Sequence, residues 1–320
     1  MQKSIQKVVS VLLCAVLLCA AVPMCVSALE TDQVYLGDVD GNDKVNAVDA
    51  RFVLQKASGA RELSELGAKT GDVNRDGKVN AIDARWILQY ATGSRLLMVL
   101  DTQTDAVSLE ATLNADSSDA EIVDYFNLVL NRVKPHAGSV TISRAATSLA
   151  GEIEGDMPEQ TRDMLTKMFA ENCGEEDVSE VPPAKTAAEK NELFPVEGES
   201  WSSKVTLDDV KTVQFAEKNG IYTISITVLA DPLSADTQPG SGHFGKVFSV
   251  MTPADLDDGS GMMQNIKTGN RGGTVTITVD KNTGNVSHAS YSGVYLSYME
   301  ISGTAMTVPL CMEAEYIIAW

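Results

Sequence analysis

The stretch from Gly71 to Gly93 reads GDVNRDGKVNAIDARWILQYATG, and its first half has the spacing of a twelve-residue calcium loop. Loop positions 1, 3, 5, 9 and 12 carry oxygen-bearing side chains, which are Asp72, Asn74, Asp76, Asn80 and Asp83. The carbonyl of Lys78 adds a ligand at position 7, and Gly77 stands where the loop turns sharply. An apolar stripe at helical spacing follows at once. We therefore expect the loop to lead directly into a helix that ends near Gly93.

The same pattern occurs 34 residues earlier, from Gly37 to Gly59, as GDVDGNDKVNAVDARFVLQKASG. Its predicted ligands are Asp38, Asp40, Asn42, the carbonyl of Lys44, Asn46 and Asp49. Two matches in one frame, each followed by the same helix pattern, would rarely arise by chance. We therefore expect two bound Ca²⁺ ions. The alternative is a pair of acidic turns that cap helices without any metal.

Both loops end in Asp, where the full calcium hand has Glu, and no convincing helix precedes the first loop. This duplicated half-hand resembles the type I dockerin family over roughly residues 35–98. The resemblance implies a small all-α module in which two loop-helix units enclose two Ca²⁺ ions. It also implies docking onto a cohesin module of a scaffold protein, as in cellulosome-type complexes.

Two residues of the first loop depart from the family pattern, because Asn42 and Asp43 stand where Asp and Gly are usual. Asp tolerates the left-handed backbone conformation better than most residues, so we expect the turn to persist. The second loop is expected to bind calcium more tightly. The resemblance assigns contacts with the partner to six residues, which are Ala47, Val48, Arg51, Ala81, Ile82 and Arg85. Apolar pairs replace the hydroxyls frequent in the family, so the recognition surface is expected to be apolar.

Residues 1 to about 28 have the pattern of a secretory signal. Lys3 and Lys7 precede an apolar run from Val8 to Val22, and small residues at Val26-Ser27-Ala28 offer a cleavage site. An uncleaved membrane anchor is the alternative. No later segment approaches the eighteen or more apolar residues that span a bilayer. We expect an exported protein with no membrane contact after cleavage, either secreted or attached to the cell surface through the scaffold.

The formal net charge of −19 argues against binding to nucleic acid and to anionic membrane surfaces. Beyond the signal the chain has only Cys173 and Cys311. One long-range disulfide and two free thiols are both open alternatives, while two cysteines provide no zinc pattern.

Residues 118–320 are predicted to form an α+β domain after a linker over 99–117. A helix starts near Ser118 or Asp119, and its buried stripe consists of Ile122, Val123, Phe126, Val129, Leu130 and Val133. A second helix is expected from Pro158 to about Glu171. Its apolar face of Met164, Leu165, Met168 and Phe169 is predicted to pack in the core, a plastic binding surface being the alternative. The segment from Glu175 to Lys190 is interpreted as a mobile loop.

Strand patterns dominate after Trp201, and Asn219-Gly220 is a hairpin signal. We expect strands over 205–215, 222–229, 275–279, 286–291, 294–301, 305–310 and 312–318. The predicted fold is two helices on one face of a curved antiparallel sheet. The layout, Trp201 to Lys204 included, resembles only an uncharacterised C-terminal module of exported proteins and implies no activity.

No catalytic residue is predicted for this domain. The Gly240 to Gly245 run is interpreted as a loop entering a strand over 246–250, with a ligand-framing loop as the alternative. The acidic pairs Glu152/Glu154 and Glu197/Glu199 do not stand out from the acidic background. Function is therefore predicted to be calcium-dependent docking with a non-catalytic C-terminal domain. The alternatives are a polysaccharide-degrading enzyme and a carrier of a small apolar ligand.

Overall fold

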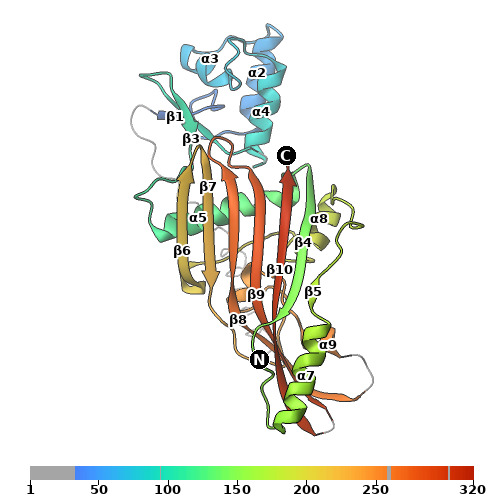
Figure 1. Cartoon of the computed structure of the whole chain (residues 1–320). Helices are drawn as coiled ribbons and strands as arrows, with labels where there is room; N and C mark the ends of the chain where they lie inside the picture. Colours follow the sequence, from blue (N-terminus) through green and yellow to red (C-terminus); the bar gives the residue numbers. More distant parts are fainter. Residues whose placement is uncertain (1–32, 94, 258–260, 302) are drawn as a thin grey trace, which may run out of the picture.

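The computed structural model describes residues 33–93, 95–257, 261–301 and 303–320. The predicted secretory signal lies outside these residues. A small helical module stands at one end of a larger domain that is built on one long sheet (Figure 1). Within the described residues, every helix is too short or too polar to cross a membrane.

Three helices form the small module, namely α2 (Ala47–Ala57), α3 (Glu65–Gly71) and α4 (Ala81–Ala91). Asn46 and Asn80 cap α2 and α4, and Asp49 and Asp83 complete a capping box at each helix. The two helices predicted after the loops are confirmed. The helix α3, which precedes the second loop, was not predicted. A shared core holds the module together, and it consists of Leu36, Val39, Ala50, Val53, Val73, Ala84, Ile87, Tyr90 and Leu100.

A three-stranded antiparallel sheet borders the helices, in the order β1 (Gln33–Tyr35), β2 (Met98–Asp101) and β3 (Val107–Leu109). The expectation of an all-α module and of a linker over 99–117 is corrected here. Gln33 pairs with Asp101, and Leu100 of β2 is fully buried in the core of the module. Strands of three or four residues that pair over such a separation leave no local periodicity in the sequence.

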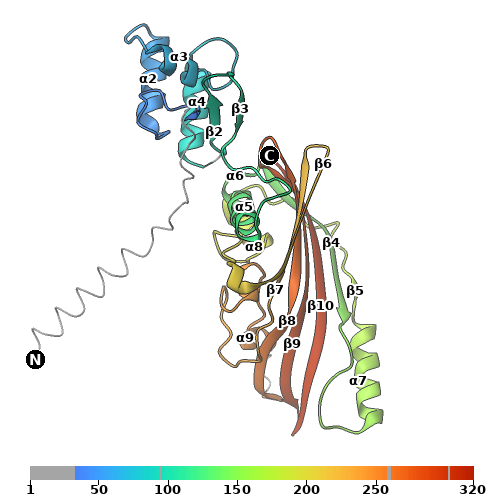
Figure 2. The same cartoon turned by 90° about the vertical axis from the view of Figure 1, so that its left-hand side faces the viewer.

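Seven antiparallel strands form the large sheet, in the order β5-β4-β10-β9-β8-β7-β6. Their bounds are β4 (Ser139–Leu149), β5 (Gly174–Glu175), β6 (Val210–Lys218), β7 (Ile221–Val228), β8 (Met263–Asp280), β9 (Val286–Ile301) and β10 (Thr304–Ala319). The sheet is long and strongly twisted (Figures 1 and 2). The predicted antiparallel sheet is thereby confirmed.

Two pairs of predicted strands are single strands in the structure. The strand β9 joins the segments 286–291 and 294–301, and β10 joins 305–310 and 312–318. Gly293 makes room within β9 rather than ending it, because a Cβ there would lie 2.6 Å from the Phe244 ring. The predicted Asn219-Gly220 hairpin is confirmed. Both turn residues have positive φ, 54° and 77°, as a type I′ turn requires.

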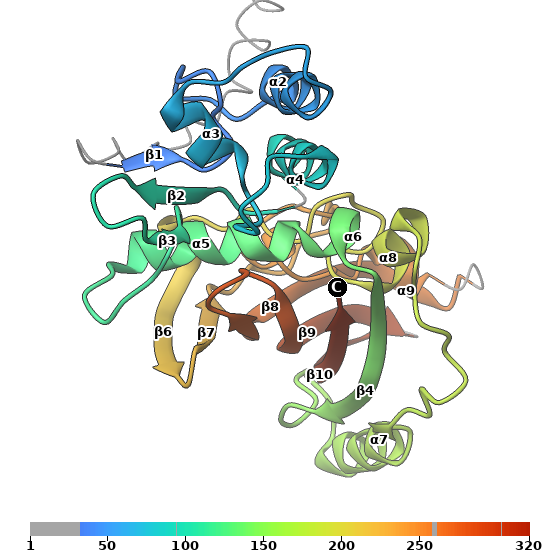
Figure 3. The same cartoon turned by 90° about the horizontal axis from the view of Figure 1, so that it is seen from above.

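The helix α5 (Asp119–Asn131) crosses one face of the large sheet (Figure 3). It begins at Asp119, as predicted, and Ser118 caps it while Glu121 completes a capping box. All six side chains of the predicted stripe are buried. A short helix, α6 (Val133–His136), follows immediately, so Pro135 lies inside a helical turn rather than ending α5.

The helix α7 (Glu159–Glu171) lies on the other side of the sheet from α5, so the prediction of both helices on one face is wrong (Figures 2 and 3). Leu165 and Phe169 pack against a cluster around Met157 and Met306. Met164 and Met168, however, are 63% and 47% exposed. The prediction that the whole Met-rich face packs in the core is therefore wrong for Met164 and Met168. The helix has no buried residue, since only one of its sides meets the domain.

The segment from Glu175 to Lys190 is more ordered than the predicted mobile loop. It leads into α8 (Ala187–Leu193), which Thr186 and Glu189 stabilise with a capping box. Lys190 is buried and donates a hydrogen bond to the carbonyl of Ala137 at 2.5 Å. A lysine that buries its apolar stem and pairs its charge resembles an exposed lysine in the sequence.

The Trp201 to Lys204 segment is held against the helices by side chains. Asn131 on α5 accepts hydrogen bonds from the N–H groups of Ser202 and Ser203, at 2.7 and 2.9 Å. Behind this segment, the ammonium of Lys134 donates to three backbone carbonyls, those of Val196, Glu199 and Trp201. Burial lowers the pKa of Lys134 to about 8.

The loop between β7 and β8 contains η2 (Phe244–Lys246) and α9 (Pro253–Leu256), and η1 (Leu207–Asp209) precedes β6. The strand predicted over 246–250 is therefore wrong. Asp231 organises the loop, because its carboxylate accepts hydrogen bonds from the N–H groups of His243 and Phe244, both at 2.9 Å.

Cys173 and Cys311 are free thiols. Cys311 on β10 pairs with Ser148 on β4, and the adjacent Thr147 pairs with Gly174, so one strand separates Cys311 from Cys173. Two strand spacings of about 4.8 Å exceed the roughly 7 Å that a disulfide can bridge between Cα atoms. The structure therefore favours the free-thiol alternative.

Candidate metal centre

The acidic side chains of the first loop converge. Asp38, Asp40 and Asp49 each offer a carboxylate oxygen, and these oxygens lie within 4.8 Å of one another. Asp38 and Asp49 are buried, whereas Asp40 is exposed. Carboxylate oxygens are the ligands that Ca²⁺ prefers in proteins. These three residues therefore fit the core of a calcium site.

The backbone of the first loop winds around its first ligand. The Oδ1 atom of Asp38 accepts a hydrogen bond from the N–H of Gly41 at 2.9 Å, and Oδ2 accepts one from Asp43 at 2.8 Å. The last ligand, Asp49, accepts a hydrogen bond from the N–H of Val39 at 3.0 Å. The bond from Val39 to Asp49 joins the two ends of the loop, and it involves protein atoms alone.

The second loop repeats this pattern with a looser set of acids. Asp72 accepts a hydrogen bond from the N–H of Gly77 at 2.9 Å, and Asp83 accepts one from Asn74 at 3.3 Å. The Asp76 carboxylate bonds to its neighbours, the Asn74 amide at 3.2 Å and the N–H of Lys78 at 2.9 Å. Among the described residues, only the acids of the first loop form a group within 4.8 Å. Tighter binding by the second loop therefore stays a prediction.

The backbone conformations of the two loops match at two positions. The fourth residues, Gly41 and Arg75, have φ angles of 73° and 60°. The sixth residues, Asp43 and Gly77, have φ angles of 62° and 83°. The left-handed turn thus exists in the first loop without its usual glycine, as the sequence led us to expect.

The remaining predicted ligands lie on the surface of the loops or at helix starts. Asn46 and Asn80 use their side-chain oxygen as a cap and accept from the N–H groups of Val48 and Ile82, both at 2.8 Å. A residue at the ninth position often reaches calcium through water, which is compatible with this role. The others occupy exposed positions and are Asn42, Lys44, Asp76 and Lys78.

The electrostatics of both loops favour a bound cation. Burial raises the pKa of Asp38, against the lowering effect of three backbone N–H groups, and the Asp49 carboxylate adds to the increase. Burial also raises the pKa of Asp83, and the nearby charges of Asp72 and Asp76 act in the same direction. A divalent cation would offset this repulsion between carboxylates.

The six predicted partner residues lie on equivalent exposed surfaces of α2 and α4. Val48 and Ile82 are 39% and 50% exposed, and Leu54 and Leu88, two turns further along, are 47% and 43% exposed. We call these two surfaces the docking faces; they consist of Ala47, Val48, Arg51 and Leu54 on α2 and of Ala81, Ile82, Arg85 and Leu88 on α4. Each is an apolar strip that contains one arginine. The internal repeat therefore produces two chemically similar faces.

The repeat includes one further feature that was not predicted, a cation–π pair behind each helix. The guanidinium of Arg61 lies 3.6 Å from the centroid of the Phe52 ring, and that of Arg95 lies 3.9 Å from the Trp86 ring. Both pairs are separated by the same offset of 34 residues as the loops. The repeated arginine after Gly59 and Gly93 is the sequence signal of this stacking. The stacking holds each helix to the segment that follows it.

One member of each acidic pair of the C-terminal domain is engaged in another contact. Glu154 forms an ion pair with Arg271, and Glu199 accepts a hydrogen bond from the Trp201 indole at 2.7 Å. His243 contacts the buried carboxylate of Asp209 through Nδ1 at 2.9 Å. Lys246 and His243 hold the pKa of Asp209 down to about 2, although burial opposes them. These contacts fasten the loops to the sheet.

Comparisons with known proteins agree with the reading of the N-terminal repeat. No curated protein and no solved structure matches the chain. Residues 36–90, which contain both loops and the helices α2, α3 and α4 up to Tyr90, match the family model of the Dockerin type I domain, so the resemblance that the repeat carries is confirmed.

Proposed function

We propose that this chain is an exported docking protein, whose dockerin region binds a cohesin module of a scaffold protein in a calcium-dependent manner. The observation that carries the proposal is the pairing of two like loops with two like exposed faces. Each loop feeds directly into the helix that bears a docking face. Order in the loop therefore determines where the face points.

Each of the two proposed ions would be held by one loop. In the first loop the ligands are Asp38, Asp40, Asn42, the Lys44 carbonyl, Asn46 and Asp49. In the second loop they are Asp72, Asn74, Asp76, the Lys78 carbonyl, Asn80 and Asp83. Bound calcium would neutralise the clustered carboxylates and couple metal binding to folding of the helices.

The docking faces are suited to an apolar partner surface. Val48 and Leu54 lie exposed on α2, and Ile82 and Leu88 lie exposed on α4. Exposed aliphatic side chains that converge in one strip, with an arginine beside them, are typical of binding surfaces. Because α2 and α4 carry like faces, we propose that either face can meet the partner.

The C-terminal domain is proposed to be non-catalytic cargo that the dockerin region attaches to the scaffold. One carboxylate of each acidic pair considered for hydrolysis supports this, because Glu154 and Glu199 are engaged by Arg271 and Trp201. Extracellular calcium is plentiful, which suits weak sites in an exported protein.

The test is capture of the full chain by immobilised cohesin modules in calcium and in EDTA. We expect binding between nanomolar and micromolar dissociation constants in calcium and none in EDTA. Asp72→Ala combined with Asp83→Ala should weaken capture, while Asp163→Ala on α7 serves as a matched control in the other domain. Capture that is unchanged by EDTA would exclude the calcium dependence, and absence of capture by cohesins would exclude the partner class.

A further inference from the structure

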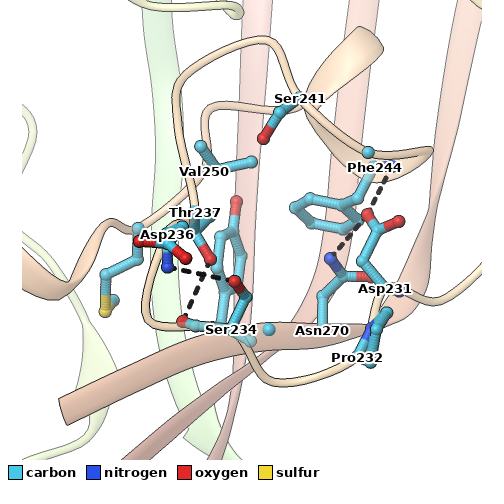
Figure 4. Close-up of a pocket in the computed structure, with 13 residues that line it drawn as sticks. Asp231, Pro232, Ser234, Asp236, Thr237, Ser241, Phe244, Val250 and Asn270 are labelled. Carbon is cyan, nitrogen blue, oxygen red and sulfur yellow. Dashed lines mark hydrogen bonds between the residues drawn. The ribbon is translucent and has the colours of Figure 1, made fainter.

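A pocket of about 190 Å³ lies beneath the loop between β7 and β8 (Figure 4). Its lining consists of Asp231, Pro232, Ser234, Asp236, Thr237, Ser241, Gly242, Phe244, Val250, Met251, Gly269, Asn270 and Tyr295. The volume corresponds to about six waters at their share of the liquid. None of these residues belongs to the calcium loops or the docking faces.

The half-buried ring of Tyr295 supplies the aromatic surface of the pocket, and the fully buried ring of Phe244 supports it. The rings of Phe244 and Tyr295 lie 5.0 Å apart between centroids and at 87° to each other. The hydroxyl of Tyr295 donates to the carbonyl of Ser249 at 2.9 Å, which fixes the ring. Val250 and Met251 extend the apolar surface. The C–H groups of a ligand would pack against Tyr295, Val250 and Met251.

The opposite edge of the pocket is rich in hydrogen-bond acceptors. Figure 4 places Asp236 and Thr237 across the pocket from Phe244. The Thr237 hydroxyl donates a hydrogen bond to the carbonyl of Thr268 at 3.2 Å, so the lone pairs of this hydroxyl are left to accept. The Ser241 hydroxyl donates to the carbonyl of Gln238 at 2.6 Å and accepts from the N–H of Gln238 at 3.2 Å, so one of its lone pairs is left to accept. Within the described residues, the carboxylate of Asp236 makes no hydrogen bond or ion pair. These oxygens suit a ligand that carries several O–H donors.

The pocket is preorganised by a buried pair of polar side chains. Asn270, which is 6% exposed, donates from its amide to the Asp231 carboxylate at 3.0 Å. Its oxygen accepts hydrogen bonds from the N–H groups of Asp231 and Gly272, both at 3.0 Å. Two residues away on β8, the hydroxyl of Thr268 is buried and lacks a hydrogen-bond partner. A loop fixed in this way loses little entropy when it binds a ligand.

The charges of the lining residues disfavour anionic ligands. Two carboxylates line the pocket, and none of its thirteen lining residues is Lys, Arg or His. Phosphates and carboxylates are therefore disfavoured. A neighbouring hollow of about 590 Å³ shares Thr237 and Val250 and also lacks basic residues in its lining. A ligand seated in the pocket has room to continue along this hollow.

We propose that the pocket binds a neutral sugar ring whose C–H groups pack against Tyr295, Val250 and Met251 and whose hydroxyls donate to Asp236, Thr237 and Ser241. Further rings of an oligosaccharide extend into the neighbouring hollow. This proposal is independent of the docking proposal, because it rests on a different domain.

Saturation-transfer NMR on the full chain tests the proposal, with calcium held constant. The probes are neutral hexoses and pentoses, with glucuronate and glucosamine as charged counterparts. A single ring has few heavy atoms, so we expect millimolar dissociation constants for the best neutral sugar. Asp236→Ala should weaken binding about tenfold, since it removes a charged acceptor, and Asp236→Asn should weaken it less. Ser241→Trp at the exposed rim should abolish binding by filling the pocket.

Asp163→Ala on α7 is the matched control and should bind like the unchanged protein. All these positions are exposed, and equal melting temperatures would show that the variants fold. The proposal is overturned by saturation transfer that is absent for every neutral sugar, that survives Ser241→Trp, or that occurs only with glucuronate or glucosamine. Cohesin capture measured on the same samples is a separate readout, so failure of one proposal is distinguishable from failure of the other.

Discussion

Substitutions at Asp43 test whether backbone strain destabilises the first loop. Asp43 has a φ angle of 62°, whereas Gly77 occupies the equivalent position of the second loop at 83°. The left-handed conformation costs an L-residue roughly 1–2 kcal/mol. Glycine avoids this cost but brings about 0.4–1 kcal/mol of additional entropy loss on folding. We therefore expect Asp43→Gly to stabilise the first loop by about 0.5–1 kcal/mol.

Charge is the competing effect, and a second variant removes it. Asp43→Asn eliminates the carboxylate but retains a residue that tolerates positive φ. This variant should therefore leave the stability of the loop nearly unchanged. The reverse substitution, Gly77→Asp, provides the mirror experiment. Nothing lies within 4 Å of a Cβ built on Gly77, so no steric clash adds to the backbone cost of about 0.5–1 kcal/mol, and Gly77→Asn separates that cost from the added charge.

Hydrogen exchange of the full chain, measured by mass spectrometry in saturating calcium, reports on each loop-helix unit separately. A change of 0.5–1 kcal/mol corresponds to a change of about two- to fivefold in the exchange rate. Asp43→Gly should slow exchange over 38–57 and leave 72–91 unchanged. Gly77→Asp should accelerate exchange over 72–91.

Two outcomes would refute the reasoning about strain. If Asp43→Asn slowed exchange as much as Asp43→Gly, removal of charge rather than release of the backbone would be the cause. If Asp43→Gly accelerated exchange over 38–57, Asp43 would contribute more to the loop through its carboxylate than its backbone conformation costs.

Four further outcomes follow from the structure. Removal of calcium with EDTA, and the paired substitution Asp72→Ala with Asp83→Ala, should each lower the melting temperature of the dockerin region; equal melting in both would contradict the calcium reading. Val48→Glu with Ile82→Glu should abolish cohesin capture without changing calorimetric melting, because both side chains are exposed. In EDTA, the protection of residues 72–91, taken as the exchange rate relative to the intrinsic rate at the same pH, should increase as the pH falls through the raised pKa of Asp83 toward its ordinary value, since the folded state binds more protons than the unfolded state; Asp83→Asn should reduce this dependence. Arg132→Ala should broaden the interdomain distances measured by small-angle scattering, whereas an unchanged profile would show that the junction does not depend on this side chain.

Local patterns explain which parts of the fold were predictable from the sequence. The loops, the helices α2, α4 and α5 and the Asn219-Gly220 turn all depend on residues within a few positions of one another. The strands β1 to β3 could not be predicted in this way, because the pairing of Gln33 with Asp101 joins distant segments. The prediction of two strands where β9 is continuous was wrong for the same reason, since the role of Gly293 within β9 depends on the Phe244 ring from another segment.

The sites differ in the same respect. Both loops carry their proposed ligands within twelve residues, so spacing alone identified them. The pocket combines the Gly240 to Gly245 run, for which a ligand-framing loop was the alternative, with Asn270 of β8 and Tyr295 of β9, and the sequence does not show that these segments meet. Asp231 has two oxygens engaged by the loop itself, which only the folded chain reveals.

The junction between the two parts determines how cargo and scaffold are oriented. Arg132 donates hydrogen bonds to the carbonyl of Gly284 at 2.9 Å and to that of Gly93, at the end of α4, at 3.4 Å. The side chain of Leu96 is buried against Gly284, where it leaves no room for a Cβ. The helix that carries one docking face is thus fastened to the turn between β8 and β9, and both of these strands also line the sugar pocket proposed above. The loop between β7 and β8, which contains α9 and supplies much of the pocket lining, lies away from the dockerin region (Figure 2). A cohesin bound to α4 would therefore hold the pocket at a fixed direction and distance from the scaffold, in contrast to cargo on a flexible linker.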